Sequence, residues 1–189
     1  EILNNPQANL RPGLKALIEV AGLAGKTITA SHVGYWLAPR LNAAGRLAEA
    51  KQGVELLLTE DGEEAKGIAK FLDERNRHRQ ALENEIITEA LSMIEQRKSF
   101  GEDKVVVLAS ENWHEGVKGI VASRLVDRFC RPTFLFSIKD KIAKGSARSI
   151  PNFHLCKALS KVNDLIDTYG GHAFAAGLRL QAKNLESFR

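Results

Sequence analysis

The stretch from Gly170 to Gly177, GGHAFAAG, holds the residues best suited to bind an anion. Two adjacent glycines let the backbone take a positive φ or approach a ligand closely. A histidine follows directly, and small residues then run to the third glycine. This pattern indicates a loop that presents backbone N–H groups and the imidazole of His172 to a phosphate. A glycine turn before a buried strand at 175–180 explains the same residues equally well.

A second cationic segment covers residues 113–124, where Trp113-His114-Glu115-Gly116 leads into an expected helix. A helix N-terminus carries partial positive charge and free N–H groups, and Lys118 adds a full charge. Trp113 is either a core anchor or a platform on which a base stacks. Farther along, Gly145–Ser149 is a strand with little bulk around Arg148.

The polar side chains that could converge are cationic or hydrogen-bonding: His114, Lys118, Arg124, Ser146, Arg148 and His172. Such a set binds phosphates. It lacks the carboxylate cluster that a divalent metal prefers.

A third group is the segment 39–46, PRLNAAGR, which brings Arg40, Asn42 and Arg46 within eight residues. Two guanidinium groups can grip phosphate oxygens in pairs. The alternative is a surface loop whose arginines are solvated.

The composition is that of a globular protein with a mild positive charge. The 189 residues are 44% hydrophobic, enough for a real core, and the net charge of +4 is compatible with a polyanionic partner without requiring one. Cys130 and Cys156 form no metal-ligand pattern, so we expect reduced, semi-buried cysteines in a cytoplasmic protein. No membrane span or signal peptide is evident. The chain begins without methionine and ends inside an expected helix, so we expect a fragment of a longer polypeptide.

Helical periodicity dominates the first half of the chain. We expect helices at 14–20 and 52–58, with Thr29 or Ser31 capping a helix between them. Apolar residues at three- and four-residue steps predict one long helix over 63–97. Its middle, 73–80, is polar on every face, which indicates either a rod crossing a wet cleft or a bundle helix with a solvated centre.

Strand patterns appear only in the second half. We expect strands at 104–109, 133–138, 142–149 and 175–180, with helices at 117–129 and 155–166. The turn at Asp140-Lys141 makes one connection a hairpin. This order predicts an α/β domain with a mixed sheet.

Taken together, the motifs resemble the RecJ family of DHH phosphoesterases. The resemblance runs from about residue 10 to the end, and its motifs occur in this order: PRLNAAGR at 39–46, WHEGVKGIVASR at 113–124, GSARS at 145–149 and GGHAFAAG at 170–177. The last motif alone is shared by several DHH-type phosphoesterases. The four motifs together, with a long helix after the first motif, indicate the RecJ family.

The resemblance implies a division of labour. In that family a DHH domain carries Asp and His ligands for two manganese or magnesium ions, and a long helix joins it to a DHH-associated domain. Residues 1–60 would be the helical tail of the DHH domain, 61–99 the connector helix and 100–189 the DHH-associated α/β domain. The chain contains no Asp-His-His triplet. The resemblance therefore places the metal ions on the missing N-terminal half.

The resemblance also assigns roles to residues. Arg148 and His172 would grip the phosphate or terminal nucleotide, and Gly170 and Gly171 would permit close approach. Lys118 stands where the family usually has an apolar residue. The substrate-binding residues expected are Arg148, His172, Gly170, Gly171, Ser146, His114, Lys118, Arg124, Arg40, Asn42 and Arg46. No catalytic or metal-binding residue is expected in this chain.

The implied activity is a metal-dependent exonuclease of DNA repair and recombination that digests single-stranded DNA from 5′ to 3′. This fragment by itself would be a monomer that binds the strand weakly and hydrolyses nothing. A single-strand binding protein is a further candidate partner. Two alternatives stay open: a DHH-type enzyme that cleaves short oligonucleotides or nucleotides, and a non-catalytic nucleic-acid-binding module.

Overall fold

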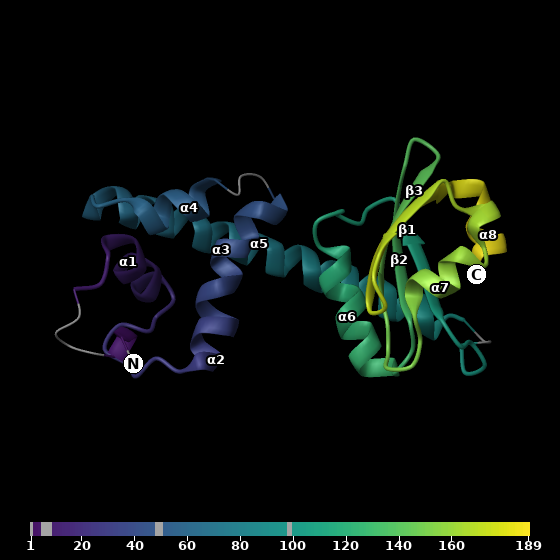
Figure 1. The fold of residues 1–189 in the computed structure, drawn as a ribbon, viewed down its shortest axis with the longest axis horizontal. Helices are drawn as coiled ribbons and strands as arrows, with labels where there is room; N and C mark the ends of the chain where they lie inside the picture. The colour runs from purple at the N-terminus through teal and green to yellow at the C-terminus, as the bar shows by residue number, and fades with distance from the viewer. Residues whose placement is uncertain (1, 5–8, 48–50, 98–99) are drawn as a thin grey trace. The chain divides into compact units, whose positions relative to one another are not determined.

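The structure, a computed structural model, describes residues 2–4, 9–47, 51–97 and 100–189, without the side chains of residues 2, 46 and 47. It divides into two compact units, unit 1 (Glu1–Ala81) and unit 2 (Leu82–Arg189). Unit 1 is helical, whereas unit 2 contains every strand of the described residues (Figure 1). None of the helices in the described part of the chain is long and apolar enough to cross a membrane.

Unit 1 packs short helices against the first part of a long one. Its elements are η1 (Ile2–Asn4), α1 (Pro12–Val20), α2 (Ala30–His32), the π-helix η2 (Val33–Leu37), α3 (Ala38–Leu47) and α4 (Lys51–Leu58). Leu17, Leu23, Leu56 and Leu72 are fully buried in one core. Thr29 caps α2 by accepting a bond from the N–H of His32, so the predicted cap is confirmed.

The surface loop considered for residues 39–46 is wrong, because this segment lies in α3. Proline in a helix clashes with the carbonyl four residues before it. Here Pro39 directly follows the wider π-turn of η2, in which the N–H of Ala38 bonds Val33 O, five residues back. Ala43 and Ala44 are fully buried, so tertiary packing holds this helix in place.

The predicted long helix is confirmed as α5 (Gly62–Glu95), which contributes residues to both units. The apolar stripe of α5 is buried at both ends. Its buried residues are Ala65 and Leu72 in unit 1 and Ile86 and Ala90 in unit 2. The polar middle is less solvated than its sequence suggests. Asp73, Asn76 and Arg79 are buried, and Arg79 donates a 2.9 Å bond to Asn76 Oδ1.

Unit 2 is built on a mixed sheet, as predicted, but with five strands instead of the four expected. Its strands are β1 (Val106–Ser110), β2 (Thr133–Lys139), β3 (Ile142–Arg148), β4 (Thr168–Gly171) and β5 (Ala175–Gln181), in the order β1-β2-β3-β5-β4. Only β1 and β2 are parallel. Asp140 and Lys141 both have positive φ, which matches the two-residue turn of a tight hairpin between β2 and β3.

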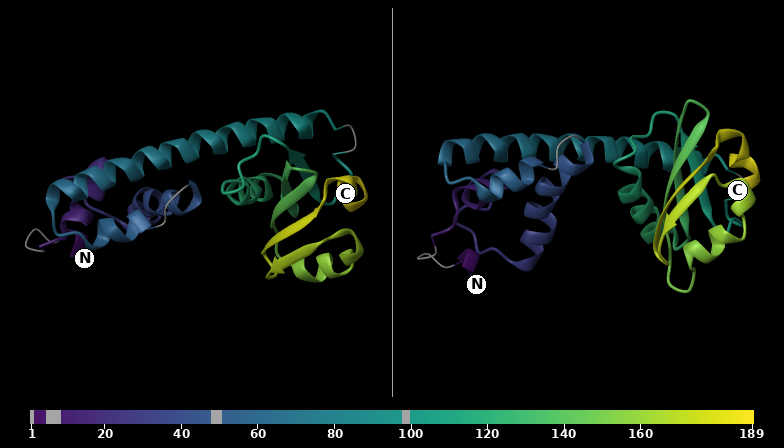
Figure 2. Two further views of the ribbon diagram at one scale, coloured as in Figure 1. Left: turned by 90° about the horizontal axis from the view of Figure 1, so that it is seen from above. Right: turned by 45° about the horizontal axis from the view of Figure 1, so that its top comes forward.

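Helices cover the two faces of this sheet unequally. Figures 1 and 2 show α6 (Lys118–Phe129) on one face and α7 (Leu155–Ser160) with α8 (Leu185–Phe188) on the other. The α7 face holds an apolar cluster that includes Phe136, Leu155, Leu159 and Leu180. The short turns η3 (Asn163–Leu165) and η4 (Ala182–Asn184) complete the unit.

Three details of unit 2 differ from the sequence analysis. Strand β4 was not predicted, and it contains Gly170 and Gly171, which we had expected in a loop. The helix expected at 155–166 ends at Ser160, because Ile166 is already extended on the way into β4. Cys130 is exposed rather than semi-buried, and its left-handed conformation ends α6.

Candidate nucleic-acid interface

Alternation along β3 separates a buried face of the sheet from an open one. Ala143 and Ala147 are fully buried in the cluster under α7. Side chains two apart point to the same face, so Lys144, Ser146 and Arg148 lie on the face that carries α6. The sequence motif at 145–149 therefore presents its polar residues on that side.

This face is hollowed beside the start of α6. Ser146 pairs with Gly177 of β5, and Gly177 pairs with Gly170 of β4, so the three residues lie side by side. The cavity above them has a volume of about 500 Å³. It is lined by Glu115, Lys118, Lys144, Gly145, Ser146, Thr168, Tyr169, Gly170, Gly177, Leu178 and Arg179. Three predicted residues, Lys118, Ser146 and Gly170, therefore share one cavity.

Arg148 and Ser146 lie together against the first turn of α6. A Cβ atom placed on Gly119 would lie 2.8 Å from Arg148 Nη2 and 3.1 Å from Ser146 Oγ. Arg148 Nη1 also donates a 2.8 Å bond to the carbonyl of Ala147. Glycine at 119 thus leaves room for these two side chains to pass, and their polar ends are held close together.

Lys118 is a buried ammonium group at the wall of this cavity. Its side chain is nearly inaccessible, and Nζ donates to Ser137 Oγ at 2.6 Å and to the carbonyl of Lys144. Burial lowers the pKa of Lys118 from 10.5 to about 8, an effect opposed by the nearby carboxylate of Glu115 and reinforced by the charge of Lys144. At neutral pH the amine therefore still carries its proton and adds positive charge beneath the cavity.

His172 lies in the turn between β4 and β5. Its backbone N–H donates to Ala175 O at 2.9 Å, and Arg148 pairs with Ala175 from the other side. The backbones of His172 and Arg148 are thus about 10 Å apart, two strand spacings. Nδ1 accepts the N–H of Phe174 at 3.3 Å, so a neutral imidazole carries its proton on Nε2. The exposed side chain can donate that proton to an anion.

The strain that glycine relieves differs between the two adjacent glycines. Gly171 has φ +145, and a Cβ there would meet the carbonyl oxygen of Ala175 at 2.3 Å. A Cβ atom placed on Gly170 would have no other atom within 4 Å. Gly171 is therefore required by the hairpin itself, whereas Gly170 is not.

Two other predicted residues are held elsewhere in unit 2. Arg124 Nη2 forms a 2.7 Å ion pair with Glu83 on α5 and does not line the cavity. His114 is exposed, and its Nδ1 accepts the N–H of Gly116 at 3.1 Å. Trp113 is a core anchor, 3% exposed, and donates a 2.7 Å bond to Glu89 on α5.

The remaining predicted residues belong to unit 1. Arg40 Nε forms a 2.8 Å ion pair with Asp73, a buried carboxylate that also binds Arg77 at 2.8 Å. Asn42 is exposed on α3. The side chain of Arg46 lies outside the described part of the structure.

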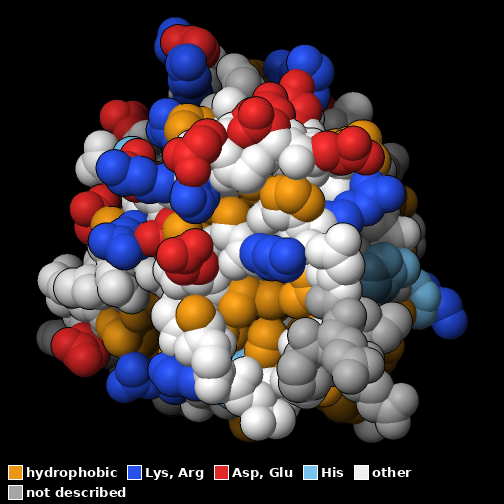
Figure 3. Space-filling model, turned by 90° about the vertical axis from the view of Figure 1, so that its left-hand side faces the viewer, with side chains coloured by type: hydrophobic (Ala, Val, Ile, Leu, Met, Phe, Trp, Pro, Cys, Tyr) orange, Lys and Arg blue, Asp and Glu red, His pale blue; other side chains and the backbone are white. Residues whose placement is uncertain are grey.

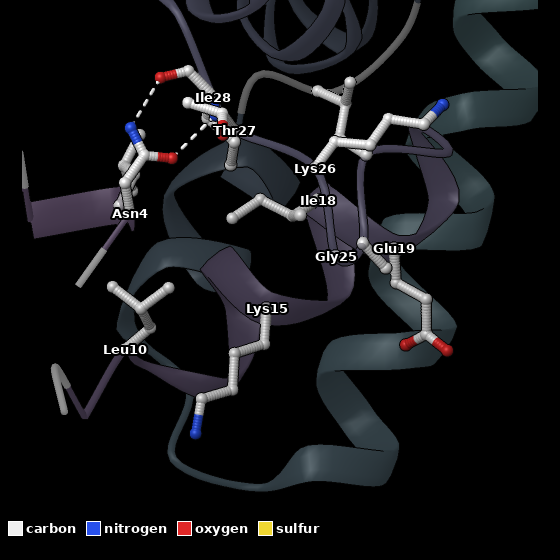
Figure 4. Close-up of a pocket in the computed structure, with 12 residues that line it drawn as sticks. Asn4, Leu10, Lys15, Ile18, Glu19, Gly25, Lys26, Thr27 and Ile28 are labelled. Atoms are coloured by element: carbon white, nitrogen blue, oxygen red, sulfur yellow. Dashed lines mark hydrogen bonds between the residues drawn. The ribbon is translucent and has the colours of Figure 1, made fainter. Parts of the chain in front are cut away.

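A slightly larger cavity lies in unit 1, and its lining includes none of the predicted site residues. Figure 3 shows hydrophobic side chains gathered in a hollow on one face of the molecule. The cavity has a volume of about 560 Å³ and is drawn in Figure 4. The Asn4 amide in its wall is already bonded to the backbone N–H and carbonyl of Ile28, at 2.6 and 2.8 Å. Its lining carries two lysines, Lys15 and Lys26, against Glu19, a smaller excess of positive charge than the sheet cavity has.

The residues present do not fit a metal centre. Across residues 2–4, 9–47, 51–97 and 100–189, no group of three or more His, Cys, Asp or Glu side chains could hold a metal ion. The sheet cavity is lined by two lysines and an arginine against one carboxylate. This cationic lining is suited to phosphate oxygens.

Comparison with known proteins agrees with the expected resemblance. Residues 102–189 match the DHHA1 domain family. The single-stranded-DNA-specific exonuclease RecJ of Bacillus subtilis is 43% identical over 182 residues, and that of Escherichia coli is 41% identical over 186 residues. The crystal structure of RecJ from Thermus thermophilus in complex with Mg²⁺ matches 99% of this chain, with a TM-score of 0.84 and 35% identity.

This chain is homologous to part of the RecJ exonucleases and contains a DHHA1 domain at residues 102–189. A crystal structure of exonuclease RecJ bound to manganese agrees with this assignment, with a TM-score of 0.82 and 35% identity over 99% of the chain. The α/β fold with a preceding long helix is thereby confirmed.

The homology covers only part of each RecJ. The two sequence matches include 95% of this chain but 23% of the Bacillus subtilis protein and 32% of the Escherichia coli protein. The two structures are covered to 28% and 45%. The chain thus spans less than half the length of the RecJ proteins and structures compared above.

Sequence reasoning missed several residues of the cavity, most clearly Lys144 and Arg179, and it noted Gly177 only as the end of the GGHAFAAG motif. Alternation along the strand from 142 to 149 could have placed Lys144 on one face with Ser146 and Arg148. No sequence signal gives the register that brings Arg179 beside Lys144, since that register depends on how β3 and β5 pair.

Proposed function

We propose that this chain is the substrate-binding part of a metal-dependent exonuclease that digests single-stranded DNA. The observation that supports this most directly is the cavity on the α6 face of the sheet. It gathers cations and bare backbone in the DHHA1 domain of a chain homologous to RecJ.

The side chains of this site bind rather than react. Ser146 and Arg148 hold a hydroxyl and a guanidinium side by side against Gly119, and together they can take two oxygens of one phosphate. His172 donates from Nε2, and the buried charge of Lys118 adds to the positive field. Such fixed donors stabilise negative charge without reorganising when the substrate arrives.

The remaining parts of the proposal concern the whole enzyme. The tail of a DHH domain takes up residues 1–60, and a connector helix follows at 61–99. The DHH-associated domain takes up residues 100–189. Digestion runs from 5′ to 3′ in DNA repair and recombination, in the cytoplasm, by a monomer that a single-strand binding protein can recruit. The hydrolytic chemistry belongs to two manganese or magnesium ions held by residues outside this chain.

The test is binding and hydrolysis by the 189-residue chain itself. Fluorescence anisotropy with a labelled, 5′-phosphorylated single strand should show weak binding that falls as salt rises, because phosphate contacts release counterions. Arg148→Ala should weaken binding about tenfold, the contribution of one hydrogen bond to a charged group. Lys157→Gln, on the α7 side of the sheet, removes a positive charge without touching the site and should bind normally.

Three results would count against the proposal. Release of nucleotides above background in manganese would place the reaction centre within this chain. Equal binding by the wild type and Arg148→Ala would remove the sheet face from the site. Tight binding of mononucleotides with no affinity for longer strands would favour an enzyme acting on small substrates.

A further inference from the structure

Register across β3, β5 and β4 divides the open face of the sheet into three rows. Arg148 pairs with Ala175 in the first row. The second row consists of Ser146, Gly177 and Gly170, and the third consists of Lys144, Arg179 and Thr168. Neighbouring rows are about 7 Å apart, two residues of strand rise. The order across the face is therefore cation, bare backbone, cation.

The two glycines of the second row have no structural reason to lack a side chain. Gly170 has no atom within 4 Å of a Cβ position, and the nearest atom to a Cβ on Gly177 is the carbonyl oxygen of Gly145 at 4.0 Å. Neither residue has a positive φ. By contrast, a Cβ on Gly145 would meet Phe136 at 2.5 Å and Leu178 at 2.6 Å. Both unexplained glycines line the cavity, so the space above them is what their small size preserves.

The third row supplies positive charge at the far side of that space. Arg179 is exposed, and its guanidinium has no hydrogen bond or ion pair within the ranges that the structure describes. Lys144 Nζ lies 3.1 Å from the carboxylate of Glu115, with both side chains about half exposed. Arg179, Lys144 and Glu115 all line the cavity of about 500 Å³, and they also line an adjoining hollow of about 360 Å³.

We propose that Arg179 and Lys144 form a second anion site, which binds the phosphate following the one held by Ser146 and Arg148. The sugar or base between the two phosphates lies over Gly177 and Gly170. This inference rests on the proposed function of the first site. Glu115 holds Lys144 at the rim while the site is empty and competes with the incoming phosphate for the lysine.

The test compares thymidine 5′-monophosphate with the 5′-phosphorylated thymidine dinucleotide by calorimetric titration of the 189-residue chain. The dinucleotide should bind about tenfold more tightly, because its second phosphate gains hydrogen bonds to charged groups. Arg179→Gln should abolish that gain and lower mononucleotide affinity much less than Arg148→Ala does. Glu115→Gln should strengthen dinucleotide binding, and Lys157→Gln serves as the control for charge.

A separate variant tests the open space above Gly177 and Gly170. Gly177→Ala places a methyl group in open space, so the chain should fold with an unchanged melting temperature and bind both ligands more weakly. A similar affinity for mononucleotide and dinucleotide, or an undiminished gain in Arg179→Gln, would overturn the second site while leaving the first intact. Failure of both ligands to bind the folded wild type would instead contradict the proposed function.

Discussion

The substitution Gly119→Ala separates the position of Arg148 from the stability of the fold. The new Cβ would lie 2.8 Å from Arg148 Nη2 and 3.1 Å from Ser146 Oγ. Non-bonded heavy atoms rest at about 3.5 Å, so the guanidinium has to withdraw by roughly 0.7 Å. The displaced atoms are the ends of side chains. We therefore expect the fold to accept the methyl group, and the helix to gain up to about 1 kcal/mol from the better helix former.

Binding should respond in the opposite direction. A displacement of about 1 Å in a positioning group can cost as much as about 100-fold, and a hydrogen bond to a charged group contributes about 1.5–3 kcal/mol. A partial displacement of Arg148 should therefore weaken binding of a 5′-phosphorylated single strand by up to about tenfold, the loss expected for Arg148→Ala. The melting temperature should stay the same or rise.

Thermal denaturation and fluorescence anisotropy measure the two effects on the same samples. Gly67→Ala is the matched control, because Gly67 lies in helix α5 with no atom within 4 Å of a Cβ position. It should gain helix stability without changing affinity. In an Arg148→Ala background, Gly119→Ala should have no further effect on binding, since residues that act through one contact are not additive.

Unchanged affinity in a folded Gly119→Ala chain would refute the reasoning, because the phosphate grip would then not depend on where Arg148 is held. Additive losses in the double variant would also refute it. They would show that the methyl group acts by some route other than Arg148.

Two further predictions concern charges buried in unit 2. Because the pKa of Lys118 is lowered from 10.5 to about 8, the unfolded chain binds more protons than the folded chain between these pH values. We expect the unfolding free energy of the wild type, relative to that of Lys118→Met, to rise by at most about 3 kcal/mol between these pH values. Urea titrations at several pH values measure this difference. A difference that stays flat or falls would contradict the burial penalty on Lys118. Arg124→Ala removes the cation paired with Glu83, which is 1% exposed, and should destabilise the chain by about 2–3 kcal/mol in the same assay. Glu83→Gln should cost less, and a loss of strand binding without a loss of stability would show that Arg124 contacts the substrate.

Local patterns account for the elements that the sequence predicted well. The strands at β1, β2, β3 and β5 have β-branched content or alternation of period two, and α5 has apolar residues at helical steps. These signals depend on neighbours within a few residues, so they survive without tertiary information. The segment 39–46 was misjudged because Pro39 and Gly45 break helices locally, whereas burial of Ala43 and Ala44 outweighs them.

Short elements that depend on a partner were the ones missed. Strand β4 has four residues, TYGG, and two of them are poor strand formers. It exists because β5 offers it an edge to pair with. Arg40 and Arg124 likewise read as phosphate ligands in sequence, but each pairs with an acid on α5 that lies 33 or 41 residues away.

The sequence by itself determined the fold class, the long helix, the family resemblance and the cationic character of the site, because each of these depends on residue type and short-range spacing. Only the tertiary structure decided which cations share a cavity. Strand pairing set Lys144 beside Arg179 and Ser146 beside Gly177, and packing of α6 set Gly119 against Arg148. Register and helix docking are fixed by contacts between distant segments, and no local pattern encodes them.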